Sequence, residues 1–144
     1  MGAGAREAVT SITLIRVPPS RRWWALSQMR EAPESLREHA GLLFGKLMGS
    51  GSGVGFSARP NLRVWAVLTV WENPEAFVRW HEGPWLSAYR RRAVDVVTIL
   101  QRPIRARGLW GGVQPFPIDD QEPSTALRAV ITRERSTFST KERT

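Results

Sequence analysis

The residues with the clearest capacity for chemistry in this chain of 144 surround a glycine-rich segment. Glycines alternate at positions 49, 51, 53 and 55, with Lys46 before them and Arg59 and Asn61 after them. Alternate glycines let a backbone approach a ligand closely or adopt positive φ angles. The segment fails the dinucleotide fingerprint, because the third required glycine falls on Val54 or Phe56, and it fails the P-loop pattern, because a leucine follows Lys46. Two interpretations of the segment stay open. It is either a structural connection in a hairpin or a loop that binds an anion or a carbonyl group.

The chain has two histidines, His39 and His81, and no cysteine. His81 lies among Phe77, Trp80 and Trp85 on an expected helix, where a neutral imidazole could face an apolar cavity. His39 comes near the end of a polar helix, where we expect it to contact the last carbonyl groups. Without cysteine there is no disulfide, no thiolate ligand and no closed zinc site.

Seven tryptophans stand against one tyrosine, which is the most unusual feature of the composition. They come from separate segments, and a small four-stranded domain rarely needs so much indole to fill its core. Two interpretations stay open: an aromatic-lined cavity for a large flat or polyene ligand, or a dimer interface.

Basic side chains number 21 against 13 acidic ones, and nearly all of them are arginine. This balance suits nucleic acid, anionic lipid or an acidic cofactor, and it also follows from an arginine-preferring genome. The strand expected at 62–71 lacks the aromatic pattern of RNA-recognition domains, so we expect no nucleic-acid binding. There is no apolar run of about 18 residues and no secretory signal pattern. We expect a cytoplasmic protein that contacts the surface of a membrane peripherally.

Short strands and helices must position these residues. The hydrophobic pattern predicts strands over 11–17, 42–48, 62–71 and 94–100, a helix from Arg21 capped by Ser20, a second short helix over 33–39, and a helix from Pro74 that breaks at Gly83-Pro84. This order is the βαββαβ pattern of a ferredoxin-like α+β domain, with an antiparallel sheet and helices on one face. We expect that domain over 1–104, an irregular arm and linker over 105–126, and a short strand with a disordered tail over 127–144.

The glycine-rich segment resembles the signature of the spheroidene monooxygenase family, the acyclic carotenoid 2-ketolases. The matching run is Phe44-x-Lys46-Leu-Met-Gly49-Ser-Gly-Ser-Gly-Val-Gly55-Phe56-Ser-Ala-Arg59-Pro60-Asn61. The resemblance covers about residues 11–133 and includes Arg22-Trp23, Gln28-Met29, Val64-Trp65-Ala66 with Trp71, Tyr89-Arg90 and Arg107-Gly108-x-Trp110-x-Gly112-x-x-Pro115-Phe116. The chain resembles the first half of the family plus the start of the second. Two copies would then pair to restore the missing half, or the chain is a shortened, inactive relative.

The resemblance implies a dimeric α+β barrel type of fold, a b-type haem (heme b) with its iron, and O₂-dependent oxygenation of an apolar, carotenoid-like substrate. Electrons would come from an external donor such as a ferredoxin-type reductant, and the chain would act as a homodimer. Within this resemblance the roles of single residues are hypotheses. Haem propionates or a bound oxygen species would be held by Lys46, Arg59 and Asn61. The cofactor loop would consist of Gly49, Ser50 and Gly51, and the apolar pocket would be lined by Phe56, Trp65 and Trp85. The axial ligand of the iron would be His81.

Two other classes use the same architecture. One is a cofactor-independent monooxygenase or small-ligand binding protein of the dimeric α+β barrel type. The other is an inactive structural dimer that buries its tryptophans at the subunit contact.

Overall fold

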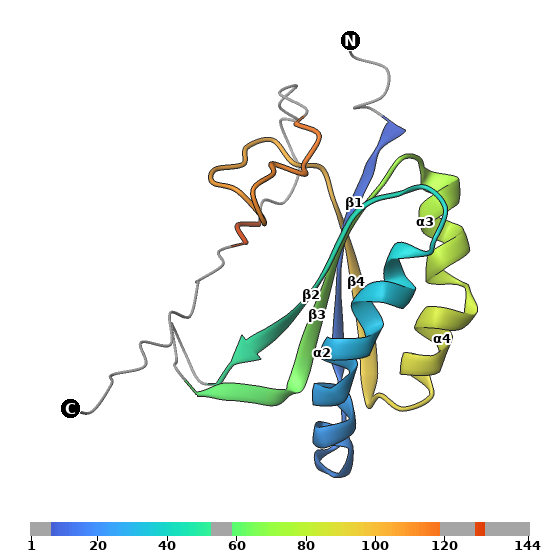
Figure 1. Ribbon diagram of the computed structural model, residues 1–144, viewed down its shortest axis with the longest axis vertical. Coiled ribbons are helices and arrows are strands. Elements are labelled where there is room, and N and C mark those ends of the chain that lie inside the picture. The colour runs from blue at the N-terminus through green and yellow to red at the C-terminus, as the bar shows by residue number, and fades with distance from the viewer. Residues whose placement is uncertain (1–6, 53–58, 119–128, 132–144) are drawn as a thin grey trace, which may run out of the picture.

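The computed structural model of the chain describes residues 7–52, 59–118 and 129–131 (Figure 1). Phe56 and the end of the glycine-rich segment lie outside the described residues, and of the short strand expected after 127 only 129–131 are described, without strand structure. The elements are β1 (Val9–Arg16), the 3-10 turn η1 (Pro19–Arg21), α2 (Arg22–Arg37), β2 (Leu42–Gly51), β3 (Pro60–Trp71), α3 (Pro74–His81), α4 (Pro84–Arg90) and β4 (Asp95–Gln101).

The four strands form one antiparallel sheet in the order β2-β3-β1-β4. Figure 1 shows α2, α3 and α4 together on one face of this sheet, while the segment that follows β4 crosses to the other side. We call these the helix face and the open face. The order of elements and the strand order are those of the ferredoxin-like α+β fold, as expected.

The residues of β3 alternate between the two faces of the sheet. Trp65, Val67 and Trp71 belong to the core beneath the helices, with Thr69 between them. Ala66, Leu68 and Val70 point to the open face, and they are also buried. The aromatic side of the strand is therefore the one covered by helices.

The expectation of two helices before β2 was wrong, because α2 runs unbroken from Arg22 to Arg37 with Pro33 inside it. Ala25, Ala32 and Leu36 are buried along one side of this helix, so its apolar face continues past the proline. The expected cap was also wrong: Ser20 lies in η1, and the N-cap residue Arg21 makes no side-chain cap hydrogen bond.

The helices after β3 follow the expectation. The Asn73 side chain accepts a hydrogen bond from the backbone nitrogen of Ala76 at 2.9 Å, which caps α3. Gly83 separates α3 from α4, and a Cβ at Gly83 would lie 2.5 Å from the carbonyl oxygen of Arg79. The chain can therefore turn between the two helices only with glycine at this position.

β2 is longer than expected and takes in the first part of the glycine-rich segment. Gly49, Ser50 and Gly51 are strand residues, with an irregular register between Gly49 and Ser50. Gly45 allows α2 to approach this strand, because a Cβ there would lie 2.8 Å from Leu36 Cδ2. None of the helices in the described residues is long and apolar enough to pass through a membrane.

Replacing Gly41 with alanine is expected to destabilise the fold. Gly41 has φ +83°, and a Cβ there would lie 2.6 Å from the Cβ of Ala76 in α3. A left-handed alanine costs about 1–2 kcal/mol and overpacking about 1–3 kcal/mol, so we expect the free energy of unfolding in urea to fall by about 2–4 kcal/mol. Gly112→Ala is the control, since Gly112 has φ +90° and a Cβ there would meet no atom of the described residues within 4 Å. Equal losses in the two variants would contradict the contact between Gly41 and α3.

Candidate functional site

Four hydroxyl side chains lie side by side on the helix face of the sheet. The strand registers pair Ser11 with Thr69 and Thr13 with Thr98. The side-chain oxygens of Ser11 and Thr69 are 2.7 Å apart, and those of Thr13 and Thr98 are 2.9 Å apart. We call these four residues the hydroxyl row. It places polar groups in the layer where aromatic side chains otherwise fill the core.

His81, the last residue of α3, lies over one end of the hydroxyl row. Its Nε2 is 3.2 Å from Thr98 Oγ1 and 3.1 Å from Arg90 Nη2, and Arg90 Nη1 donates to the His81 carbonyl oxygen at 2.7 Å. Partial burial, followed by the charge of Arg90, lowers the pKa of His81. Because a guanidinium only donates, we assign Nε2 as the acceptor of a neutral imidazole.

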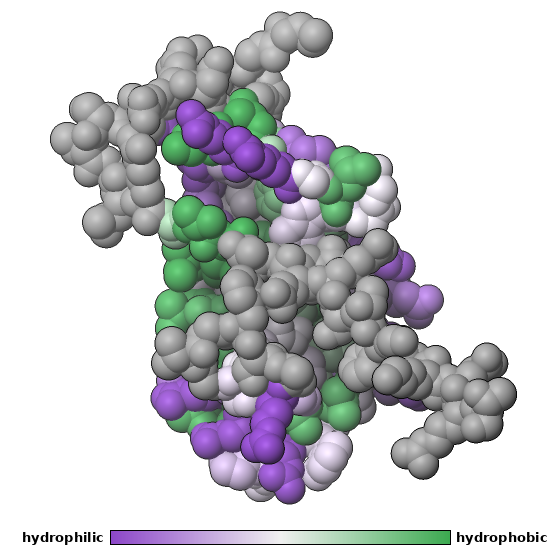
Figure 2. Space-filling model, turned by 90° about the vertical axis from the view of Figure 1, so that its left-hand side faces the viewer, coloured by the Kyte–Doolittle hydropathy of each residue, from purple (hydrophilic) through white to green (hydrophobic). Residues whose placement is uncertain are grey.

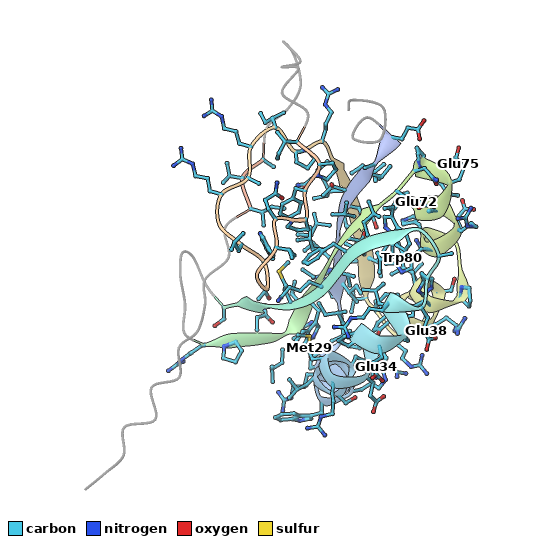
Figure 3. All side chains as sticks on the ribbon, turned by 45° about the horizontal axis from the view of Figure 1, so that its top comes forward. Met29, Glu34, Glu38, Glu72, Glu75 and Trp80 are labelled. Carbon is cyan, nitrogen blue, oxygen red and sulfur yellow. The ribbon has the colours of Figure 1, made fainter. Side chains whose placement is uncertain are left out.

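Two indole groups lie beyond the other end of the row. Trp71 Nε1 donates to Thr69 Oγ1 at 2.8 Å. The Trp80 ring packs on the Trp71 ring with centroids 5.5 Å apart, and Figure 3 shows Trp80 between α3 and the sheet. Trp80 Nε1 is buried and has no hydrogen-bond partner among the residues that the structure describes. A buried polar group without a partner is uncommon in native proteins, so this N–H group is a donor available inside the layer.

The tryptophan rings pack against one another within this one chain. The centroid of Trp85 is 5.8 Å from that of Trp80 and 4.6 Å from that of Tyr89, and Trp24 is 5.6 Å from Tyr89. Trp65, Trp71 and Trp80 are buried, whereas Trp23 is 63% exposed. Most of the tryptophan rings thus pack between the helices and the sheet. We call this set the aromatic layer; it consists of Trp24, Trp65, Trp71, Trp80, Trp85 and Tyr89. Packing within the chain covers these rings, and neither a large open cavity nor a dimer contact is needed to cover them.

A small cavity of about 20 Å³ lies between α2 and the sheet. Its walls include Gln28, Met29, Trp65 and Tyr89, and Met29 is labelled in Figure 3. Tyr89 Oη donates to Gln28 Oε1 at 3.0 Å. This volume is enough for about one water molecule, so the layer is closed in this arrangement.

The single tyrosine offers a direct test of this packing. Burial raises the pKa of Tyr89 to about 12. Because the folded state holds the proton more tightly than the unfolded state, stability is expected to fall as the pH rises from about 10 to about 12. We expect tyrosinate absorbance at 295 nm to appear near pH 12 in the folded chain and near pH 10 in urea, with no other tyrosine to obscure it. A folded chain that titrates near pH 10 would show that the ring is open to solvent.

The three polar residues that flank the glycine-rich segment do not all lie close together. Lys46 pairs with Leu68 and lies on the open face, whereas Asn61 pairs with Ser50, which lies about 13 Å from Lys46 along β2. Asn61 Oδ1 accepts from the backbone nitrogen of Arg63 at 3.0 Å. The carbonyl oxygen of Arg59 accepts from the Ser52 backbone nitrogen at 3.0 Å and side chain at 3.2 Å. Arg59 and Asn61 therefore lie near the tip of the β2-β3 hairpin, away from the backbone of Lys46.

The apolar candidates do come together. Trp85 belongs to the aromatic layer, Trp65 lines the small cavity with Tyr89, and Gly49 pairs with Trp65 across the two strands. A Cβ at Gly49 would lie 3.6 Å from the Trp65 ring. His81 joins the same layer through ring contacts with Trp80. His39, as expected, contacts a helix-terminal carbonyl, with Nδ1 3.0 Å from the Leu36 oxygen.

Sequence reasoning missed the hydroxyl row and Arg90. The signal for the row was present, because Ser11 and Thr13 alternate in an apolar strand and alternate residues share a face. Polar residues on the helix face of this small sheet were therefore a sequence signal for the site. Arg90 gave no comparable signal, since its contact with His81 depends on the turn between α3 and α4.

Two solved structures share the fold. An antibiotic biosynthesis monooxygenase superimposes with a TM-score of 0.51 at 13% identity, covering 67% of this chain and 99% of the other. A protein from Bacteroides thetaiotaomicron assigned to the same class gives a TM-score of 0.51 at 19% identity, covering 74% and 98%. At these identities the likeness shows the fold alone, and it confirms the expected dimeric α+β barrel type of ferredoxin-like domain.

Sequence comparison is more specific, although no family model matches the chain. The spheroidene monooxygenase of Rhodobacter capsulatus is 38% identical over 120 residues, which are 81% of this chain and 49% of the relative. Those of Cereibacter sphaeroides and Rubrivivax gelatinosus are 35% and 29% identical, covering 77% and 87% of this chain and 36% and 49% of the relatives. The chain spans about half the length, or less, of the curated relatives it matches. By its sequence, the chain belongs to the spheroidene monooxygenase family.

Proposed function

We propose that this chain is an oxygenase domain that places one oxygen atom of O₂ on an apolar, carotenoid-like substrate. The observation that carries the proposal is the 38% identity to a spheroidene monooxygenase over 81% of the chain. In the reaction a C–H bond becomes C–OH, and the second oxygen atom leaves as water with two electrons and two protons. The electrons come from an external donor, which we propose to be of the ferredoxin type.

The aromatic layer and the hydroxyl row supply the two halves of such a site. The rings of Trp65, Trp80 and Trp85 offer apolar area for the end of a polyene chain. The hydroxyl row and the neutral imidazole of His81 offer groups that hold an oxygen atom and move a proton beside it. Since the cavity measures about 20 Å³, the helices must separate from the sheet to admit the substrate, and closure around it excludes water.

Haem was expected from the resemblance, with His81 as its axial ligand. A neutral imidazole is the form that binds iron, which supports the proposal. Both ring nitrogens of His81, however, lie within 3.4 Å of Arg90 Nη2, and Nε2 is also close to Thr98. The residues in this arrangement do not fit a porphyrin, so we derive no step through it.

A titration with haemin decides the cofactor. If the chain binds haem through His81, a Soret band shifts on binding and the shift is lost in His81→Ala but kept in His39→Ala. If no shift occurs with the unaltered chain, haem is ruled out for this chain. Quenching of tryptophan fluorescence by a carotenoid without any haem band would then support the alternative of a cofactor-independent oxygenase or small-ligand binding protein, in place of an oxygenase that takes electrons from a ferredoxin.

We also propose that the chain is a homodimer that pairs through the open face. Val97 and Ile99 on β4 are 50% and 43% exposed, and their partners in β1 are Leu14 and Ile12. Figure 2 views this face and shows apolar side chains gathered along one side of it. Sedimentation equilibrium of the chain and of Val97→Lys tests the pairing: a dimer that the lysine dissociates supports it, and a monomer in both cases excludes it.

A further inference from the structure

One end of the molecule collects arginine side chains from three separate segments. The backbone bonds Val17 to Arg63 and Val94 to Arg16, so the turns after β1 and before β4 meet the start of β3. Figure 1 shows this end at the bottom of the view, where α2 begins and α4 ends. We call the segments 16–23, 59–63 and 90–95 the basic end. They contain Arg16, Arg21, Arg22, Arg59, Arg63, Arg91 and Arg92, together with Arg90, whose guanidinium is directed to His81.

The charge of the basic end is strongly one-sided. Asp95 is the single acidic residue of these three segments, and it forms an ion pair with Arg16. Arg21, Arg22, Arg63 and Arg91 are exposed. A concentration of cations of this kind attracts an anionic surface over about a Debye length.

Apolar side chains are exposed at the same end. Trp23 is 63% exposed, with the Arg22 guanidinium 5.5 Å from its ring centroid, and Val94 is 53% exposed. Leu26, one turn along α2, is 40% exposed and borders an open groove of about 270 Å³ with Trp23 and Arg30. Glu31 on the groove wall is the nearest carboxylate of α2. Exposed tryptophan flanked by arginine is the side-chain combination that settles at the boundary between headgroups and acyl chains.

We propose that the basic end docks on the surface of an anionic lipid bilayer, with Trp23 and Leu26 at the acyl boundary and the arginines among the headgroups. This rests on the proposed function, because an apolar substrate of the carotenoid kind is dissolved in the bilayer. Nucleic acid would pair with the arginines but leaves the exposed indole and leucine without a role. Lipid accounts for both parts of the surface.

Flotation with vesicles tests the docking. The full chain is mixed with vesicles of phosphatidylcholine alone or of phosphatidylcholine and phosphatidylserine in equal parts, at low and at high salt. We expect the chain to float with the mixed vesicles at low salt and to be released from them at high salt. With vesicles of phosphatidylcholine alone, the chain should remain in the dense fraction. A blue shift of tryptophan emission on binding follows from insertion of Trp23.

Matched variants distinguish binding through the basic end from attraction by the net positive charge of the whole chain. Arg21→Gln with Arg22→Gln is expected to lower the partition coefficient about 25-fold, at about 1 kcal/mol per cation. Arg37→Gln with Arg79→Gln removes the same charge from exposed positions elsewhere on the helices, and it should lower binding far less. Trp23→Ala should lower binding about tenfold and abolish the blue shift, whereas Leu109→Ala, at another exposed apolar side chain, should not.

Three outcomes overturn the proposal: equal binding to both kinds of vesicle, equal losses in the two arginine pairs, or binding to duplex DNA that exceeds lipid binding and ignores Trp23→Ala. The proposed function fails in a different way. If the chain oxygenates a detergent-dispersed substrate but does not bind vesicles, only the docking proposal is contradicted. If the chain binds vesicles but does not oxygenate the substrate in detergent, only the oxygenase proposal is contradicted.

Discussion

Replacing Trp80 with alanine is expected to lower the free energy of unfolding by about 3–5 kcal/mol, which is a large part of the stability of a domain of this size. Trp80 is buried and packs on Trp71, Phe77 and Trp85. Alanine leaves a cavity that the neighbouring rings of the aromatic layer cannot fill by small movements. Urea unfolding followed by circular dichroism measures the loss. Trp23→Ala is the control, because the exposed Trp23 should change stability by about 0.5 kcal/mol or less.

A pair of phenylalanine variants tests the hydrogen bonding of this layer. Trp71→Phe removes the hydrogen bond from Nε1 to Thr69, whereas Trp80→Phe removes an N–H group that has no partner in the described part of the chain. We therefore expect Trp71→Phe to cost about 1–2 kcal/mol more than Trp80→Phe. Equal costs would mean that Trp80 Nε1 has a partner in solution, with a buried water as the first candidate.

His81→Ala is expected to lower the rate of substrate oxygenation about a hundredfold or more. The imidazole reaches Thr98 at one end of the hydroxyl row, where it can move a proton next to the reacting oxygen. The effect should lie in kcat rather than in KM, because the aromatic layer that binds the substrate is unchanged. Turnover of a carotenoid followed by chromatography measures the rate.

Two variants accompany this measurement. His39→Gln alters the other histidine, which contacts a helix-terminal carbonyl, and it should leave the rate within about twofold. Thr98→Val removes the hydroxyl that His81 meets while keeping the shape of the side chain, and it should reproduce most of the loss in kcat. A His81→Ala chain as active as the His39→Gln chain would show that the imidazole takes no part.

The fold was predictable from the sequence because its signals are local. The hydrophobic pattern over 62–71 predicted the strand that became β3, and Pro74 and Gly83-Pro84 marked the starts of α3 and α4. The break in α2 at Pro33 was predicted wrongly, because buried Ala32 and Leu36 hold the helix to the sheet where proline alone would end it. Tertiary packing outweighed a local signal at that point.

The site was less predictable because it depends on distant pairing. The distance between Ser11 and Thr69 follows from the β1-β3 register, and the contact between His81 and Arg90 follows from the turn at Gly83. His81, Trp65 and Trp85 were found from residue type and position on their elements. Lys46, Arg59 and Asn61 flank one segment in sequence, but the hairpin stretches that segment along the sheet and separates Lys46 from Asn61.

Oxygenation with ¹⁸O₂ tests the central proposal most directly. The purified chain is supplied with spheroidene in detergent, a ferredoxin with its reductase, and haemin in one of two parallel reactions. We predict an alcohol product that carries one ¹⁸O atom and is absent without reductant. An unlabelled substrate in both reactions, while the Rhodobacter capsulatus relative labels it under the same conditions, would contradict the proposal that this chain is an oxygenase.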